Sequence, residues 1–297
     1  DGITTASITN GVPPANTKLL GLNDVTFNVG TTTASVDGLV IDNAWDFDGS
    51  DNVSTAYFNQ LHDGSGGSAF IWIYPTMLPA TDVGLISSSN SDFTTVGSDL
   101  QFKTDGKIKF GGMHINPNSW VVNTSPNSIT LNEWHHVGFT FVNGQTNLYV
   151  DGVETALSFS GTGKQGNSAF PIYIGSRSNT IHTSGHEYFT GKIDQVLIYD
   201  DVLTLSEVQT LYNSGSGDST PHTGNLEAHY NFEQTSGNLL DQVGTNDGTN
   251  NGATQTATGA ISSTTNIISA TGLTDNTSTA QHYAVTRDSS NGWTIYQ

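Results

Sequence analysis

The sequence has no cysteine, few basic residues and no long apolar run. Without cysteine the chain has no disulfide framework, no thiolate zinc site and no cysteine nucleophile. Only eight lysine and arginine residues accompany 27 aspartate and glutamate residues, giving a formal net charge of −19. Nucleic acid is therefore not expected as a partner, because its binding needs clustered basic residues. The apolar run at 70–74 is far shorter than the about 20 residues that cross a bilayer, so no membrane insertion is expected.

Turn-forming and strand-forming residues dominate what is present. There are 33 glycines and 8 prolines, and serine, threonine and asparagine are abundant. The run 70–74 is apolar on both faces, which predicts a central strand. Asp105-Gly106 and Asn143-Gly144 lie between strand-like stretches and predict hairpin turns. Thr204 and Glu207 fit a capping box and predict a helix. The expected fold class is all-β, a two-sheet antiparallel jelly-roll sandwich with one short C-terminal helix.

Composition divides the chain into four parts. Residues 1–18 are polar and contain Pro13-Pro14, which is typical of an N-terminal arm. Residues 19–214 carry the pattern of strands and turns and are expected to form the jelly-roll domain. Residues 215–225 have the glycine, serine, threonine and proline content of a linker. Residues 226–297 form a separate segment.

Sequence motifs in the second part resemble a known family. They occur at residues 47–53, 69–75, 85–88, 132–137, 148–153, 173–175, 189–199 and 205–209. In this order they are similar to a laminin-G-like domain of the concanavalin A-like lectin/glucanase jelly-roll superfamily. The resemblance implies two antiparallel sheets packed face to face, with loops at the rims. It implies little about the ligand, because this fold serves many functions.

The segment 226–297 is similar to the same family over two stretches. Residues 226–233 resemble the opening strand of a domain, and residues 282–286 match 136–140. The segment is therefore expected to be a partial second laminin-G-like domain. Because a half sandwich leaves unpaired strand edges, three interpretations arise. The sequence is truncated, which we favour, or the segment completes itself on a neighbouring chain, or it forms a different small fold.

The resemblance also implies a structural Ca²⁺ between an early loop and the last long strand. The ligands would be the carboxylates of Asp48, Asp51 and Asp194 and the backbone carbonyl of Gly49. Carboxylate and carbonyl oxygens are the ligands that Ca²⁺ prefers. The alternative is that Asp48-Gly49 is only a turn and that Asp194 caps a strand edge.

Aromatic and histidine side chains near polar loops are the candidates for ligand binding. Trp120 follows a polar stretch, and Tyr188 lies close in sequence to His182 and His186. Exposed aromatic rings stack on sugar rings, so these positions predict contacts with a glycan. His182 and His186 are four residues apart in a Gly/Ser/Thr loop, where this spacing has no helical meaning. The tryptophans in apolar strands are expected in the core: Trp72 and Trp134.

The sequence argues against an enzyme. Glycoside hydrolysis needs two carboxyl groups that flank one bond. The glutamates never occur as a pair at alternate positions of a strand. Asp200 and Asp201 are adjacent and would point to opposite faces of a strand. No Ser/His/Asp triad or phosphate-binding glycine loop is evident.

These expectations combine into a non-catalytic extracellular recognition or adhesion module, secreted or surface-displayed. It would bind a glycan or a protein surface through its rim loops, stabilised by Ca²⁺. The alternative is a structural or display protein of a virion surface, a fibre or a cell-surface coat, which would assemble with other chains. Saturable glycan binding separates the first function from the second.

Overall fold

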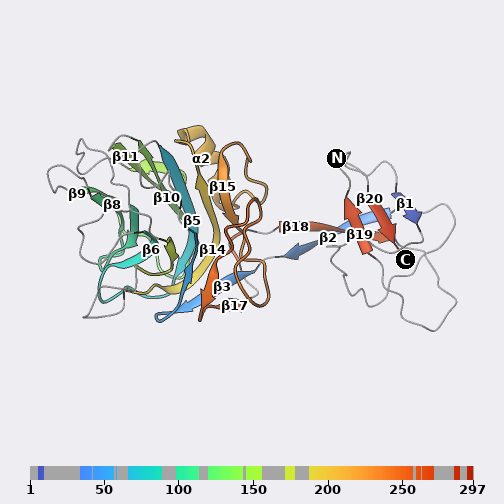
Figure 1. The fold of residues 1–297 in the computed structure, drawn as a ribbon, viewed down its shortest axis with the longest axis horizontal. Coiled ribbons are helices and arrows are strands. Elements are labelled where there is room, and N and C mark those ends of the chain that lie inside the picture. The colour runs from blue at the N-terminus through green and yellow to red at the C-terminus, as the bar shows by residue number, and fades with distance from the viewer. Residues whose placement is uncertain are drawn as a thin grey trace. The chain divides into compact units, whose positions relative to one another are not determined.

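The computed structural model describes residues 6–9, 34–41, 43–56, 58, 66–88, 98–113, 120–142, 145–155, 171–177, 187–256, 259–261, 263–270, 284–287 and 293–296. Its contacts form two compact units. One unit contains residues 41–263, and the other contains residues 1–40 together with residues 264–297. The first unit, whose strands are labelled in Figure 1, carries the candidate site.

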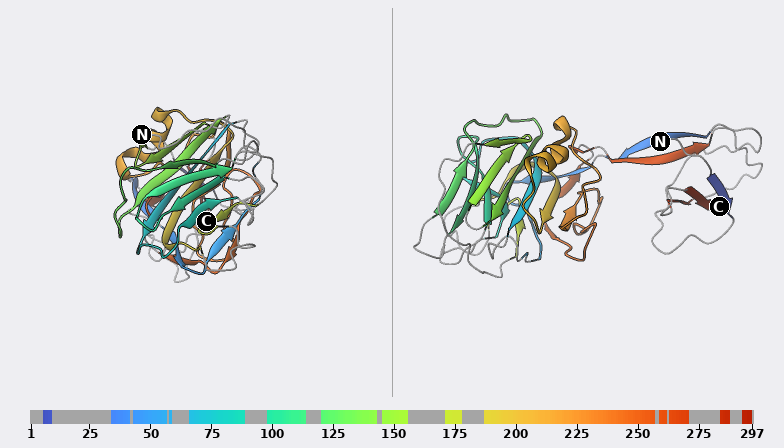
Figure 2. Two further views of the ribbon diagram at one scale, coloured as in Figure 1. Left: turned by 90° about the vertical axis from the view of Figure 1, so that its left-hand side faces the viewer. Right: turned by 90° about the horizontal axis from the view of Figure 1, so that it is seen from above.

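Two antiparallel sheets make up the larger unit. In spatial order, the first sheet consists of β12 (Val153–Thr155), β11 (Gln145–Val150), β10 (His135–Val142), β5 (Gly67–Pro75), β14 (Thr190–Tyr199), β3 (Ala44–Asp48) and β17 (Thr254–Thr256), with β15 (Leu226–Tyr230) also paired to β14. The second consists of β16 (Thr249–Asn251), β4 (Asn52–Ser54), β13 (Tyr173–Ile174), β6 (Val83–Ser87), β7 (Ser98–Phe102), β8 (Ile108–Met113) and β9 (Trp120–Thr124). Figures 1 and 2 show the two layers, which confirm the expected sandwich.

β5 is a central strand whose two faces are both buried. Ala69, Ile71 and Ile73 belong to the main core between the sheets. Phe70 belongs to a second apolar cluster on the opposite face, because successive side chains of a strand alternate. The helix α2 (Leu205–Tyr212) covers this cluster with its buried residues Val208 and Leu211. The double-sided apolar pattern therefore reflects a strand packed between a sheet and a helix.

α2 begins at the predicted capping box. The Thr204 hydroxyl accepts a hydrogen bond from the Glu207 N–H, and the Thr204 N–H donates to Glu207 Oε2 at 2.7 Å. The helix ends at Asn213, whose φ of +45° is left-handed. No helix in the described ranges is long and apolar enough to cross a membrane.

The segment 226–256 pairs with the first sandwich, which differs from the expected second copy. β15 pairs with β14, β16 pairs with β4, and β17 pairs with β3. Tyr230, Phe232 and Leu239 enter the main core. Without these strands, β3 and β4 would present unpaired edges. None of the three interpretations of the segment describes this arrangement, in which the segment completes both sheets of the preceding domain.

The smaller unit contains strands from both ends of the chain. β1 (Ala6–Thr9) pairs in parallel with β20 (Trp293–Tyr296), and β19 (Ala284–Arg287) pairs with β20 in antiparallel orientation. β2 (Ala34–Ile41) and β18 (Ser263–Ala270) form a two-stranded sheet. The expected N-terminal arm at 1–18 therefore contributes a strand.

Candidate functional site

A pocket lies where the ends of several strands of the sandwich meet. Its volume is about 180 Å³. Its lining comes from the turn after β3, the connection from β5 to β6, the end of β7 and the start of β14. The lining residues are Gly49, Met77, Pro79, Ala80, Thr81, Val83, Phe102, Tyr188 and Thr190. We call this feature the rim pocket.

Apolar and polar groups share the walls of the rim pocket. Val83 and Phe102 are buried, whereas Tyr188 is half-buried. Met77 is 53% exposed. Thr81 is exposed and supplies a hydroxyl group. A half-buried aromatic ring beside hydroxyl groups presents both an apolar face and hydrogen-bonding partners to a ligand.

Gly49 allows the loops of the rim pocket to approach one another. Its φ is +94°, a backbone conformation that glycine adopts readily. A Cβ atom at this position would lie 2.8 Å from Thr190 Oγ1. Glycine is therefore required here for the close approach of the turn after β3 to the start of β14.

The carboxylates of Asp48 and Asp51 are engaged in the turn that contains Gly49. The Ser50 N–H and hydroxyl donate to Asp48 Oδ1 at 2.9 and 2.7 Å, which lowers the pKa of Asp48. The Asp48 N–H donates to Asp51 Oδ2 at 2.9 Å. Burial raises the pKa of Asp51, and a Cβ at Gly252 would overlap its Oδ1 atom. Asp51 thus fixes the turn and packs against the turn between β16 and β17.

Asp194 lies apart from these two carboxylates. Asp48 pairs with Thr190, and Asp194 is four residues further along β14, about 13 Å at the rise of a strand. Asp194 is 1% exposed, and Gln195, at φ +26°, forms a β-bulge beside it. Its carboxylate accepts N–H hydrogen bonds from Gln195, Ala260 and Ile261 at 2.7, 2.9 and 3.1 Å. Burial nevertheless raises the pKa of Asp194 to about 8.

The residues of the predicted calcium site therefore do not fit one ion. The register of β3 and β14 separates Asp194 from Asp48, Gly49 and Asp51. The carboxylate oxygens of Asp194 accept hydrogen bonds from backbone N–H groups. Two of these bonds hold the chain at 260–261. Within the described ranges, no group of three or more His, Cys, Asp or Glu residues could hold a metal ion.

Of the four residues predicted to bind a ligand, Tyr188 lines the rim pocket. Trp120 begins β9, where its backbone pairs with Met113. His182 and His186 lie outside the described residues. The structure thus brings Tyr188 and Gly49 into one pocket, although the sequence predicts them in separate ligand and metal sites.

An aromatic pair on the larger sheet was not predicted from the sequence. Trp134 is half-buried and lies outside the core, contrary to expectation. Its ring meets that of Tyr74 edge to face, with centroids 5.5 Å apart, and Lys192 Nζ is 5.7 Å from the Tyr74 centroid. Trp134 precedes β10, so the alternation of that strand does not determine its burial. Trp72 is 1% exposed, as predicted.

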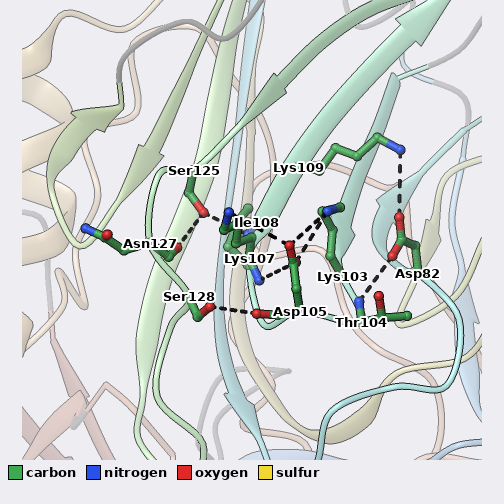
Figure 3. A network of polar contacts seen from close by, with 10 residues as sticks. All are labelled: Asp82, Lys103, Thr104, Asp105, Lys107, Ile108, Lys109, Ser125, Asn127 and Ser128. Carbon is green, nitrogen blue, oxygen red and sulfur yellow. Dashed lines mark hydrogen bonds and ion pairs between the residues drawn. The ribbon is translucent and has the colours of Figure 1, made fainter.

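The hairpin of β7 and β8 carries a network of charged groups, which begins directly after the pocket residue Phe102 (Figure 3). Lys103 Nζ donates to both oxygens of Asp105, at 3.3 and 3.2 Å. Burial disfavours the Asp105 carboxylate, but hydrogen bonds from Lys103 and Lys107 and their charges outweigh it and lower the pKa of Asp105. Lys107 Nζ is 3.9 Å from Asp105, and Lys109 Nζ is 3.9 Å from Asp82.

A second charged cluster is buried on the smaller sheet. Arg177 contacts Asp99 and Glu187, each at 2.8 Å. Asp99 is fully buried, and Glu187 contributes from the segment before β14. The sequence did not predict that these two carboxylates meet, because they come from distant elements. One guanidinium binds both, so neither is arranged as the separate proton donor that glycoside hydrolysis needs.

Comparisons with known proteins agree with the sandwich fold. A family model described as the concanavalin A-like lectin/glucanases superfamily matches residues 47–209, more than half of the chain. A protein from Bacteroides ovatus ATCC 8483, provisionally described as carbohydrate-binding, is similar with a TM-score of 0.55 and 21% identity, over 74% of this chain and 61% of its own. The chain therefore spans less than two thirds of that protein.

A second solved structure is similar over a comparable part of the chain. The heptameric SAP-like pentraxin from Limulus polyphemus has a TM-score of 0.52 and 17% identity, over 73% of this chain and 95% of its own. No curated protein sequence matches the chain. At these identities the two structures establish the fold alone. The nature of the ligand must be inferred from the residues of the site.

Proposed function

Because the chain belongs to the concanavalin A-like lectin/glucanases superfamily, we propose that it is a non-catalytic carbohydrate-binding module. The rim pocket would hold one sugar ring against Tyr188. The observation that carries this proposal is the half-buried tyrosine in the wall of an open pocket beside polar groups.

The size and lining of the rim pocket support a small polar ligand. Its volume of about 180 Å³ is below the roughly 300–1,000 Å³ of clefts that enclose drug-sized molecules. A single ring or a terminal sugar fits such a site better than an enclosed polymer. The ring face of Tyr188 offers the apolar contact, and the hydroxyls of Thr81 and Thr190 offer hydrogen bonds.

The proposed role is binding without hydrolysis. The carboxylates at the rim, Asp48 and Asp51, bond groups of their own turn. The carboxylates of Asp99 and Glu187 share Arg177. A secreted or surface-displayed location, where polysaccharides and cell-surface glycans occur, is part of the same proposal.

A glycan microarray followed by calorimetric titration of the strongest binder tests the function. Tyr188→Ala is expected to weaken binding at least tenfold, as loss of a central aromatic contact does at other sites. Tyr74→Ala is the matched control, because Tyr74 is a half-buried tyrosine that does not line the rim pocket. Equal binding by Tyr188→Ala and wild type, or no saturable glycan on the array, would overturn the proposal.

A further inference from the structure

We propose that the ion pair between Arg177 and Glu187 positions the ring of Tyr188 in the rim pocket, which makes Glu187 a positioning residue for glycan binding. This inference rests on the proposed function and concerns how its central aromatic residue is held. It depends on the backbone contacts on either side of Tyr188, on the two partners of the Arg177 side chain and on the burial of the ion pair.

The segment that carries Tyr188 pairs with residues 175–177, which follow β13. Ser176 and Tyr188 form an isolated antiparallel bridge. Beside this bridge the Arg177 N–H donates to the Glu187 carbonyl at 3.2 Å. The backbone at Tyr188 is therefore tied to the residue whose side chain also binds Glu187.

Core packing fixes the residue that follows Tyr188. Phe189 is fully buried, and its ring meets that of Phe102 with centroids 6.4 Å apart. Phe102 also lines the rim pocket. On the other side of Tyr188 the corresponding anchor is Glu187, whose side chain is held by an ion pair and not by apolar contacts.

The Arg177 side chain connects Glu187 to a strand that supplies part of the pocket wall. Its Nη1 donates to Glu187 Oε2 at 2.8 Å, and its Nε lies 2.8 Å from Asp99 Oδ2. Asp99 belongs to β7, which ends at the lining residue Phe102. The guanidinium is planar and rigid, so it holds both carboxylates in one geometry. The two contacts therefore link the Tyr188 segment to β7.

Burial makes the ion pair between Arg177 and Glu187 effective. Their side chains are only 11% and 15% exposed. Exposed ion pairs contribute little, because water and salt screen them, whereas partly buried pairs are screened much less. This pair can therefore restrict Glu187 and, through the peptide bond, the backbone of Tyr188. A ring that is already held in its binding position avoids the cost of ordering it when the ligand binds.

Binding curves of Glu187→Met on the glycan microarray test this role. Methionine is also unbranched but cannot accept the hydrogen bond from Arg177, and we expect binding about three- to tenfold weaker than for wild type, the usual cost of ordering one side chain. Glu187→Gln keeps an acceptor oxygen and should retain most of the affinity. Glu154→Met is the matched control, because Glu154 is exposed on β12 and does not line the rim pocket.

Arg177 itself is left unchanged in these variants. Its loss would leave the fully buried Asp99 without a cation, which destabilises a fold strongly. Thermal unfolding of the Glu187 and Glu154 variants verifies that each is folded.

A double-mutant cycle separates positioning from direct contact with the glycan. If Glu187 acts through Tyr188, Glu187→Met should change the affinity by less than about twofold in the Tyr188→Ala background, because the ring that it positions is gone. A loss of the same size in both backgrounds would show that Glu187 acts independently of Tyr188 and would overturn the inference.

Fluorine NMR of protein labelled with 3-fluorotyrosine follows the ring without any ligand. The chain has ten tyrosines, and Tyr188→Phe identifies the resonance of Tyr188. In Glu187→Met this resonance is expected to shift or broaden, whereas in Glu187→Gln and Glu154→Met it should stay near its wild-type position. An unchanged Tyr188 resonance in Glu187→Met would show that the ion pair does not position the ring.

The failure of this inference differs from the failure of the proposed function. If Tyr188→Ala weakens glycan binding but Glu187→Met binds like wild type, the positioning role is overturned and glycan binding stands. If no glycan on the microarray binds wild type, the proposed function falls, and the role of Glu187 in binding falls with it whatever the NMR spectra show.

Discussion

At the scale of single residues, burial decides what the acidic side chains do. Asp48 is exposed and its carboxylate stays in the turn with Ser50. Asp194 is 1% exposed and accepts three backbone N–H groups. A cavity of about 30 Å³, room for one water molecule, adjoins it between Gln195, His229 and Glu233. Asp194 therefore holds the chain at 260–261 against β14.

The pKa of Asp194 predicts a specific dependence of stability on pH. Its folded pKa of about 8 lies above the ordinary value of 3.8, so between these values the folded state binds one proton more than the unfolded state. The free energy of unfolding then falls as pH rises through this window, by at most about 1.4 kcal/mol per pH unit. The contribution is fully present below pH 3.8 and lost above pH 8.

Urea unfolding of wild type and Asp194→Asn from pH 4 to 9 measures this effect. The free energy of unfolding of wild type minus that of Asp194→Asn is expected to fall steadily as pH rises toward 8, because asparagine does not titrate. Asp200→Asn, at an exposed residue of the same strand connection, should parallel wild type. A constant difference between wild type and Asp194→Asn at every pH would contradict a raised pKa.

At the scale of elements, α2 has a structural task that its capping box supports. The helix covers the second apolar cluster, which includes Phe70, Leu197 and Tyr199. Tyr212 stacks on Trp72 with centroids 5.9 Å apart. The cap therefore stabilises the packing of one face of the larger sheet as well as the helix itself.

Thr204→Ala is expected to lower the free energy of unfolding by about 1 kcal/mol, the usual cost of removing a threonine N-cap. The loss has two sources, because the Thr204 hydroxyl bonds both the N–H and the carboxylate of Glu207. Thr210→Ala is the control within the same helix, where the exposed hydroxyl only bonds the Ser206 carbonyl. Its effect should stay within about 0.5 kcal/mol. Equal effects of the two substitutions in chemical unfolding would show that the cap contributes nothing.

Elements with strong local signals could be predicted, and those that depend on distant partners could not. β5 and α2 could be predicted because their signals, an apolar run and a capping box, each lie within a few residues of the sequence. β16 and β17 have three polar residues each, and their partners are β4 and β3. Asn251, for example, donates to Asn52, 199 residues away. No local pattern encodes such a pairing.

In the candidate site, too, residues with a local sequence signal could be predicted and those that meet through distant contacts could not. Tyr188 could be singled out because it lies close in sequence to His182 and His186. The wall at 77–81 and Phe102 at the end of β7 could not, because they meet only when the strand ends of two sheets come together. Likewise, the separation of Asp48 from Asp194 follows from the register of β3 and β14, which composition does not determine.

At the scale of the whole molecule, the 41–263 unit requires its last 38 residues. Residues 226–256 pair with both sheets and contribute Tyr230, Phe232 and Leu239 to the main core. Removing them would uncover buried aromatic surface and leave the edges of β3, β4 and half of β14 without partners. Exposed edges of this kind promote aggregation, and loss of large core side chains costs several kcal/mol each.

Two shortened chains, 41–225 and 41–263, test this dependence. The chain 41–263 is expected to unfold in one cooperative thermal transition and to elute as a single species in size-exclusion chromatography. The chain 41–225 is expected to lack that transition or to aggregate, because its loss of core and strand pairing exceeds the 5–15 kcal/mol stability of an ordinary domain. If 41–225 instead unfolds cooperatively at the same temperature as 41–263, residues 226–263 add no stability. The boundary drawn from composition at 215–225 would then mark the true end of the domain.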